Sequence, residues 1–318
     1  MKPLTIITTV LNGKAHIESM LASAPADPRI EHLVIDAGSS DGTLDVLRAQ
    51  PHLNLIVRPS LSLYSAWNEA VAAAQGRYVI FLNADDELPP GALDIMLSWL
   101  DASNGSDLLC GEAEAFSLDN SDQTRRVVYR YRGEALTGRA LAALIFGACN
   151  INAKVFPRQL ILDAGGFDTS FALAADRDLL LRIALLHPNV AWRCVAAPFY
   201  RYRIHAGSKT LQPAAARRIQ IAQEHRRIAE RLITPAATAC ETGVMLSAWM
   251  AHETAVTVLR GLEIGALRTA AAALMDLIGD APNSLTKLSA AHRWRYAYAS
   301  RLRAADTESA RGMESGHP

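Results

Sequence analysis

Short apolar runs alternate with helix-like segments through the first hundred residues of the chain. Each run is rich in β-branched and aliphatic residues, and the run at 78–82 is apolar nearly throughout, as in a strand covered on both faces. A regular alternation of strands and helices indicates a parallel sheet with helices on both of its faces. The predicted strands are 4–10, 33–35, 53–57 and 78–82, and the predicted helices are 14–24, 43–50, 63–75 and 91–100.

Three polar clusters come directly after predicted strands. They span 12–13, 36–42 and 83–87, and each lies where a strand gives way to a loop. In an open parallel sheet, ligands bind beside the carboxyl ends of the strands. The sequence therefore predicts that these clusters lie near one another and line a ligand site.

The regular alternation ends near residue 105. Strands are predicted over 108–116, 126–131 and 191–200, and helices over 135–146 and 176–186. From about residue 213 the sequence becomes rich in Ala and Arg with a helical pattern. The expected organisation is an α/β domain over 1–210, a helical C-terminal region over 211–305, and a polar tail over 306–318 that is expected to be disordered.

The composition argues against several classes of protein. The chain has 318 residues with 32 acidic and 32 basic side chains, and this balance argues against a nucleic-acid partner. The four cysteines are scattered, which fits neither a zinc site nor a disulfide framework. The most apolar long stretch, 242–262, contains His252, Glu253 and Arg260 and does not predict a membrane span. The N-terminal apolar run is too short for a signal peptide, so a cytoplasmic protein is expected.

Asp85 and Asp86 follow the apolar run at 78–82 almost directly. Two adjacent carboxylates repel each other unless a cation lies between them. A divalent metal bound together with a diphosphate meets that need, and carboxylate oxygens suit Mg²⁺ or Mn²⁺. The alternative is an acidic cluster that favours the N-terminus of the helix opened by Pro89 and Pro90.

Two further carboxylates have both a structural and a functional interpretation. Asp36 opens a loop of small residues that would let a ligand approach the backbone, and its carboxylate could accept a hydrogen bond from a base or a ribose. A turn followed by a helix cap explains Ser40 and Asp41 but leaves Asp36 unexplained. Asp176 opens an amphipathic helix, so it is either an N-cap or, in a cleft, a general base.

Taken together, in this order and spacing, these clusters resemble glycosyltransferase family 2, whose members are inverting enzymes with a GT-A fold. The resemblance covers about residues 4–210, and any one of its phrases alone would be weak. The phrases are 5–9, 34–43, 64–68, 76–86, 165–168, 176–182 and 202–208.

The resemblance implies a Rossmann-like, nucleotide-sugar-binding α/β domain with a mixed sheet. In the family, the positions of Thr9 and Asp36 hold the nucleotide base and ribose. Asp85 and Asp86 match the family's acidic metal motif, with Asp86 expected as the direct ligand of Mn²⁺ or Mg²⁺ and Asp85 nearer the ribose.

The resemblance also implies a reaction. Asp176 matches the catalytic base, and His205 lies in a loop that in relatives closes over the pyrophosphate. The implied activity is transfer of a sugar from a nucleotide diphosphate sugar to an acceptor hydroxyl, with inversion. By analogy with members of this family, the acceptor is expected to be a saccharide or a lipid-linked saccharide in bacterial surface polysaccharide biosynthesis.

Two alternative functions differ from this one at particular residues. A sugar-1-phosphate nucleotidyltransferase normally opens with a glycine-rich loop and an arginine, which residues 12–14 do not supply. A non-catalytic nucleotide-sugar-binding relative is argued against by the intact Asp85, Asp86 and Asp176.

An aromatic and basic stretch at 293–303 also allows two interpretations. On a helix, such a stretch is most often a packed face whose arginines reach toward solvent. The other interpretation is peripheral contact of the C-terminal helices with an anionic membrane at its inner face, where a lipid-linked acceptor would be presented.

Overall fold

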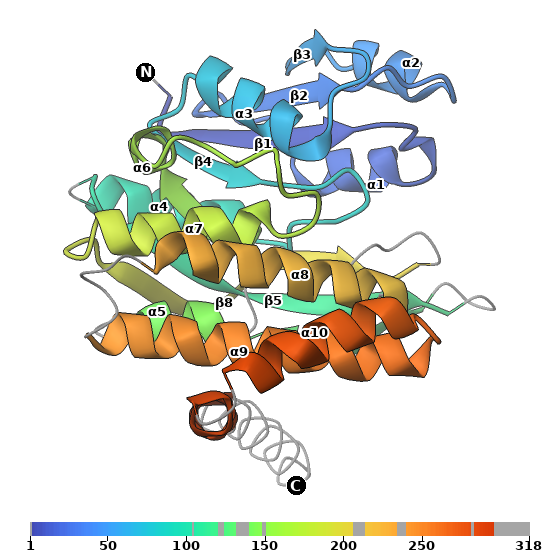
Figure 1. The fold of residues 1–318 in the computed structure, drawn as a ribbon. Coiled ribbons are helices and arrows are strands. Elements are labelled where there is room, and N and C mark those ends of the chain that lie inside the picture. The colour runs from blue at the N-terminus through green and yellow to red at the C-terminus, as the bar shows by residue number, and fades with distance from the viewer. Residues whose placement is uncertain are drawn as a thin grey trace, which may run out of the picture. The chain divides into compact units, whose positions relative to one another are not determined.

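The structure is a computed structural model of the whole chain, and it forms two compact units. One unit comprises residues 1–138 and 150–208, and the other comprises 139–149 and 209–318 (Figure 1). The residues that the structure describes are 2–103, 105–119, 124–131, 140–147, 151–205, 214–233, 240–280 and 283–295.

Four parallel strands form the first half of the sheet in the first unit, as the alternating pattern predicts. Their order across the sheet is β3-β2-β1-β4 (Figure 1). The strands are β1 (Leu4–Val10), β2 (Ile30–Asp36), β3 (Leu53–Val57) and β4 (Tyr78–Phe81). The helices that connect or follow them are α1 (Lys14–Ser23), α2 (Thr43–Arg48), α3 (Leu63–Ala73) and α4 (Ala92–Ala102).

The second half of the sheet is mixed, which confirms the predicted mixed α/β fold. β7 (Lys154–Pro157) runs antiparallel to β4 and to β5 (Leu108–Leu118). β5 pairs antiparallel with β6 (Arg125–Tyr131) and parallel with β8 (Trp192–Arg203). The helices of this half are α6 (Arg158–Asp163) and α7 (Ala175–Leu186).

The second unit is helical within its described residues. Among these, no helix is long and apolar enough to cross a membrane. The predicted helix over 135–146 appears here as α5, whereas the part of that prediction at 135–139 lies outside the described residues. The labelled helices are α5 (Ala140–Phe146), α8 (Ala215–Leu232), α9 (Glu241–Glu263) and α10 (Leu267–Gly279), and residues 283–295 form a further helix. The tail at 306–318 likewise lies outside the described residues.

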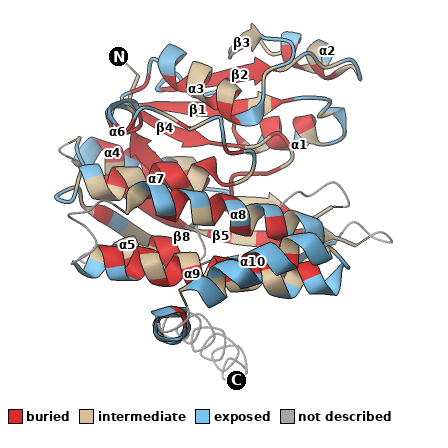
Figure 2. Cartoon of the chain, viewed as in Figure 1, coloured by how far each residue is buried: buried red, intermediate tan, exposed pale blue. Residues whose placement is uncertain are grey.

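Three of the parallel strands, β1, β2 and β4, are buried on both faces, whereas β3 is half-buried (Figure 2). All seven residues of β2 and all four of β4 are buried. Helices can cover both faces because the crossover connections place them there. Burial on both sides fixes these strands, so the loops at their carboxyl ends have a rigid base.

Polar side chains near the amino ends of β1 and β2 are hydrogen-bonded to one another. The Glu31 carboxylate accepts from the Thr5 hydroxyl at 2.7 Å, from the Asn54 amide at 3.0 Å and from the Gln75 backbone N–H at 2.7 Å. Both Thr5 and Glu31 are buried. This closed cluster ties β1, β2, β3 and the turn before β4 together.

His32 is a second buried polar group on β2. Its Nε2 lies 3.0 Å from the Thr8 hydroxyl on β1. Burial lowers the pKa of His32 from 6.5 to about 4, with a smaller contribution from His52. The ring is therefore neutral in the folded protein near neutral pH.

Candidate functional site

Asp36 ends β2, and one of its carboxylate oxygens has no hydrogen-bond partner among the described residues. Val10 of β1 pairs with Asp36, so Thr9 and Asp36 lie on neighbouring strands at their carboxyl ends. Oδ1 accepts from the backbone N–H groups of Gly38 and Ser39, both at 2.8 Å. Oδ2 is buried and has no partner among the described residues. Buried carboxylate oxygens are normally hydrogen-bonded, so this atom is positioned to accept from a ligand.

The loop after Asp36 is held in place by the loop after β1. Asn12 donates its backbone N–H to Ser39 Oγ at 2.8 Å, and its side-chain oxygen accepts from the Ser40 N–H at 2.9 Å. Gly38 has φ +98°, a conformation that L side chains rarely adopt. The two loops are therefore hydrogen-bonded to each other beside Asp36.

Asp86 is buried, and both of its carboxylate oxygens are hydrogen-bonded. Oδ2 accepts from the Tyr200 hydroxyl at 2.7 Å and from the Asn83 amide at 3.0 Å, and Oδ1 accepts from the Arg203 backbone N–H at 2.8 Å. Burial, and then the neighbouring Asp85, raise the pKa of Asp86 to about 7. These contacts join the acidic loop (residues 83–88) to the end of β8.

Asp85 differs from its neighbour in exposure and in partners. Its side chain is 40 % exposed, and Oδ2 lies 3.0 Å from His205 Nε2. Its backbone carbonyl accepts from Arg203 Nε at 3.2 Å. A carboxylate and an imidazole, two kinds of metal ligand, thus meet at the edge of the site.

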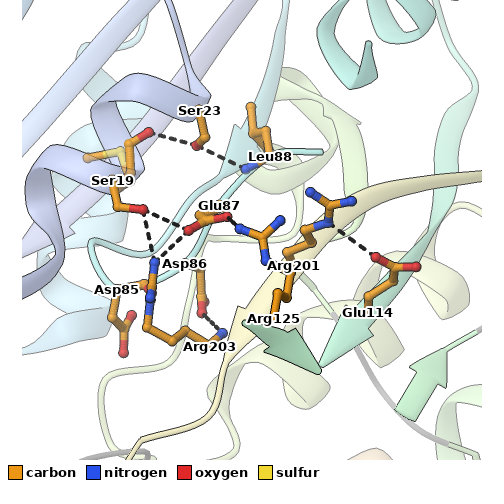
Figure 3. A network of polar contacts seen from close by, with 11 residues as sticks. Ser19, Ser23, Asp85, Asp86, Glu87, Leu88, Glu114, Arg125, Arg201 and Arg203 are labelled. Atoms are coloured by element: carbon orange, nitrogen blue, oxygen red, sulfur yellow. Dashed lines mark hydrogen bonds and ion pairs between the residues drawn. The ribbon is translucent and has the colours of Figure 1, made fainter. Parts of the chain in front are cut away.

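A buried charge network supports this pair (Figure 3). Glu87 is buried, and its carboxylate receives the guanidinium groups of Arg203 and Arg125 and the Ser19 hydroxyl, the last at 2.7 Å. Arg203 Nη2 also donates to Ser19 Oγ at 2.9 Å. The guanidinium carbons of Arg125 and Arg203 lie 4.5 Å and 5.1 Å from the centre of the Phe116 ring. Sequence reasoning missed this network, although Glu87 and Arg203 adjoin predicted site residues.

Asp176 lies in the first turn of α7 and is half-buried. The residue at the N-cap position is Ala174, and no side chain caps this helix. Asp176 Oδ1 instead accepts from the backbone N–H of Arg177 at 2.8 Å. The simple N-cap explanation therefore does not apply, and the role of general base stays a prediction.

The neighbouring Asp178 has a structural partner. It binds Arg182 one turn later at 2.6 Å, and Arg182 Nη2 also donates to the Gly166 carbonyl at 2.8 Å. The side chain of Asn68 binds the residue after Gly166: it donates to the Phe167 carbonyl at 2.8 Å and accepts from the Phe167 N–H at 2.7 Å. The phrases 64–68, 165–168 and 176–182 thus share a framework that holds the start of α7.

The donor set at Asp85 and His205 fits a divalent cation bound together with a diphosphate. Two adjacent ligands of an octahedral ion with bonds of about 2.1 Å lie about 3 Å apart, which is the separation found between Asp85 Oδ2 and His205 Nε2. No group of three or more His, Cys, Asp or Glu side chains that could hold a metal occurs among the described residues. A cation here would therefore take further ligands from substrate phosphates and water, as Mg²⁺ usually does.

Comparison with known proteins identifies the domain. A family sequence model described as glycosyl transferase family 2 matches residues 5–156. The chain contains a glycosyltransferase family 2 domain. This confirms the family and the class of enzyme that the sequence motifs indicate.

The similar proteins are distant. An uncharacterised glycosyltransferase of Mycobacterium tuberculosis is 28 % identical over 204 residues, which cover 62 % of this chain and 74 % of the relative. A putative teichuronic acid biosynthesis glycosyltransferase of Bacillus subtilis is 31 % identical over 107 residues, which cover 31 % of this chain and 42 % of the relative.

Two solved structures share the fold of this glycosyltransferase. TarS of S. aureus in complex with UDP-GlcNAc has a TM-score of 0.64 and 17 % identity, with 97 % of this chain and 92 % of that chain covered. A mannosyltransferase of Pyrobaculum calidifontis in complex with GDP-Man and Mn²⁺ has a TM-score of 0.51 and 19 % identity, with 97 % and 87 % covered. At these identities the likeness shows the fold alone.

Proposed function

We propose that this glycosyltransferase moves a sugar from a nucleoside diphosphate sugar to an acceptor hydroxyl with inversion at the anomeric carbon. The observation that carries the proposal is the pairing of Asp85 with His205. This pair follows the carboxyl ends of the strands, as does Asp36 with its unpartnered oxygen. In this arrangement Asp36 Oδ2 accepts a hydrogen bond from the base or the ribose, and Thr9 lies beside it on β1.

The cation contacts are assigned differently to the two acidic residues. Asp85 and His205 would hold Mn²⁺ or Mg²⁺, because their donor atoms are close together and partly exposed. Asp86 was expected as the direct ligand, but its oxygens already accept three hydrogen bonds that fix the acidic loop. When bound, the cation neutralises charge on the leaving diphosphate.

The remaining chemistry belongs to the acceptor side. As the acceptor hydroxyl attacks, it must lose a proton, and Asp176 is the carboxylate proposed to take it. A positioned general base contributes about 10²–10⁴-fold to such a step. Inversion requires attack from the sugar face opposite the diphosphate, so Asp176 must face the cation-binding pair across the bound sugar.

The acceptor is proposed to be a saccharide or lipid-linked saccharide in surface polysaccharide assembly. The teichuronic acid relative of Bacillus subtilis supports this assignment, although it matches only 31 % of this chain. A cytoplasmic location and membrane contact through the C-terminal helices stay predictions from the sequence.

Product release tests the proposal against its alternatives. The enzyme is incubated with UDP-, GDP- and dTDP-sugars, Mn²⁺ and cell-wall polysaccharide, and free nucleoside diphosphate is measured. We expect release from one donor class, and the Asp176→Asn variant should bind that donor normally while release falls about 10²–10⁴-fold.

Three other results would support an alternative function or exclude Asp176 as the general base. Pyrophosphate formed from a nucleoside triphosphate and a sugar 1-phosphate would indicate a nucleotidyltransferase. Donor binding with no release by the unmodified enzyme would indicate a non-catalytic relative. Undiminished turnover by Asp176→Asn would remove Asp176 from the mechanism.

A further inference from the structure

One face of α1 is turned toward the acidic loop. The Ser19 hydroxyl donates to Glu87 Oε1 at 2.7 Å, and Ser23 Oγ accepts from the Leu88 backbone N–H at 3.0 Å (Figure 3). Residues three and four positions apart lie on one face of a helix, so His16 begins the same row three residues before Ser19. α1 therefore brings an imidazole to the loop that carries Asp85.

His16 reaches the proposed cation-binding pair itself. The ring centres of His16 and His205 are 4.9 Å apart, with the planes tilted by 48°. His205 Nε2 in turn lies 3.0 Å from Asp85 Oδ2. Three segments that are distant in the sequence, namely the first turn of α1, the acidic loop and the end of β8, thus meet at one place.

The His16 side chain is available to a ligand. Within the described residues its half-buried ring makes no hydrogen bond, and it contacts the ring of His205. An imidazole has at least one N–H donor in either of its protonation states, so the ring can donate to a ligand. At the start of α1, the backbone N–H of Lys14 already donates to Asp41 at 3.0 Å. The donor that α1 can offer to a ligand here is therefore the His16 imidazole and not the Lys14 amide.

The surroundings favour an anionic acceptor for that donor. The Arg203 guanidinium donates to Ser19 at 2.9 Å, three residues after His16 on the same row of α1, and so brings a positive charge to this face of the helix. Among the described residues, Asp85, His205 and His16 do not form a three-ligand metal group. A diphosphate oxygen fits both observations, because it accepts from an N–H and is attracted by the neighbouring guanidinium.

We propose that His16 is a further donor-binding residue, whose imidazole N–H donates a hydrogen bond to the diphosphate of the nucleotide sugar beside the cation held by Asp85 and His205. This inference rests on the proposed function. It assigns recognition of the leaving group to α1 as well as to the acidic loop and the end of β8.

Calorimetry with nucleotides tests this assignment. UDP, GDP and dTDP are first titrated into the unmodified enzyme with Mn²⁺, and the tightest of them is compared with its own nucleoside. We expect His16→Ala to weaken the nucleoside diphosphate about tenfold, the loss of roughly one hydrogen bond to a charged group, and to leave the nucleoside unchanged. His16→Gln, which keeps an N–H donor, should recover part of the affinity.

A matched control is the exposed His52, which directly precedes β3 at the amino end of the sheet. His52→Ala should bind both ligands as the unmodified enzyme does. Equal nucleoside diphosphate affinity in His16→Ala would overturn the proposal, and so would an equal loss for the nucleoside, because the contact would then not be to the diphosphate.

Mn²⁺ binding without nucleotide, followed by electron paramagnetic resonance, provides a second measurement. His16→Ala should leave Mn²⁺ affinity unchanged, whereas a marked loss would make His16 a metal ligand and overturn the diphosphate assignment. If the unmodified enzyme binds none of the nucleoside diphosphates, the proposed function fails, and this inference fails with it. If it binds one and His16→Ala binds it equally, only this inference fails.

Discussion

The two ends of the parallel strands both contain polar side chains, but they use them differently. Near the amino ends, Glu31 accepts hydrogen bonds from Thr5, Asn54 and the Gln75 backbone, and these bonds satisfy both of its oxygens. At the carboxyl ends, Asp36 keeps one buried oxygen without a partner among the described residues, and the Asp85 side chain is 40 % exposed.

The difference shows that burial of a carboxylate is not in itself a sign of function. Glu31 and Glu87 are both buried and both hydrogen-bonded. Glu31 joins strands, whereas Glu87 fixes Arg203, which in turn holds the backbone carbonyl of Asp85. The unpartnered oxygen of Asp36, the exposed Asp85 and the charged network around Glu87 distinguish the carboxyl end as the proposed ligand site.

The largest expected effect comes from removing Glu87. Glu87→Ala leaves the buried Arg203 without its carboxylate, and breaking a buried ion pair in this way costs about 3–5 kcal/mol of unfolding free energy. Nucleoside diphosphate affinity should fall as well, because the acidic loop loses its anchor. Urea unfolding and calorimetry measure the two effects, and Glu87→Gln provides a milder variant if Glu87→Ala does not fold.

Glu31→Gln is the matched control at the other end of the strands. It should cost about 1–3 kcal/mol, because buried hydrogen bonds are disturbed, and the folded protein should bind nucleotide as before. An equal loss of nucleotide affinity in the Glu31 and Glu87 variants would erase the distinction between the two ends.

A smaller effect is expected from acid, through His32. The unfolded chain takes up a proton near pH 6.5, whereas the folded protein keeps His32 neutral down to about pH 4. The unfolded state therefore binds more protons at His32 in this interval, so this residue alone lowers stability by roughly 3 kcal/mol as the pH falls through it, whereas the raised pKa of Asp86 acts in the opposite direction. Urea unfolding at pH 7, 5.5 and 4 should show that the unmodified protein loses stability relative to His32→Gln as the pH falls, since the contribution of Asp86 is common to both proteins; parallel curves would contradict this.

Local sequence patterns predicted the parallel half of the sheet well. β1 to β4 and their helices follow from the alternation of apolar runs with helical spacing, because each element shows its own periodicity. α6, only six residues long, was not among the predicted elements. An element of this length offers too few positions for a period to be recognised.

The site was predicted only as far as its residues belong to recognisable phrases. The motifs identified Asp36, Asp85, Asp86, Asp176 and His205, whereas the burial and hydrogen bonding of Asp86 depend on the Tyr200 hydroxyl and the Arg203 backbone N–H of β8. Arg203 meets Ser19 across 184 residues, and His16 meets His205 in the same region of the fold. Such contacts leave no periodic signal in one sequence.

The central claim is that Asp85, with His205, binds the cation that accompanies the donor diphosphate. Its most direct test is calorimetric titration of the preferred nucleoside diphosphate, with and without Mn²⁺, into the unmodified enzyme and Asp85→Ala. We predict that Mn²⁺ strengthens binding at least tenfold, or about 1.4 kcal/mol, in the unmodified enzyme, because the ion is bound by both the protein and the diphosphate, and that it has no effect in Asp85→Ala. Full Mn²⁺ enhancement in Asp85→Ala would contradict the claim.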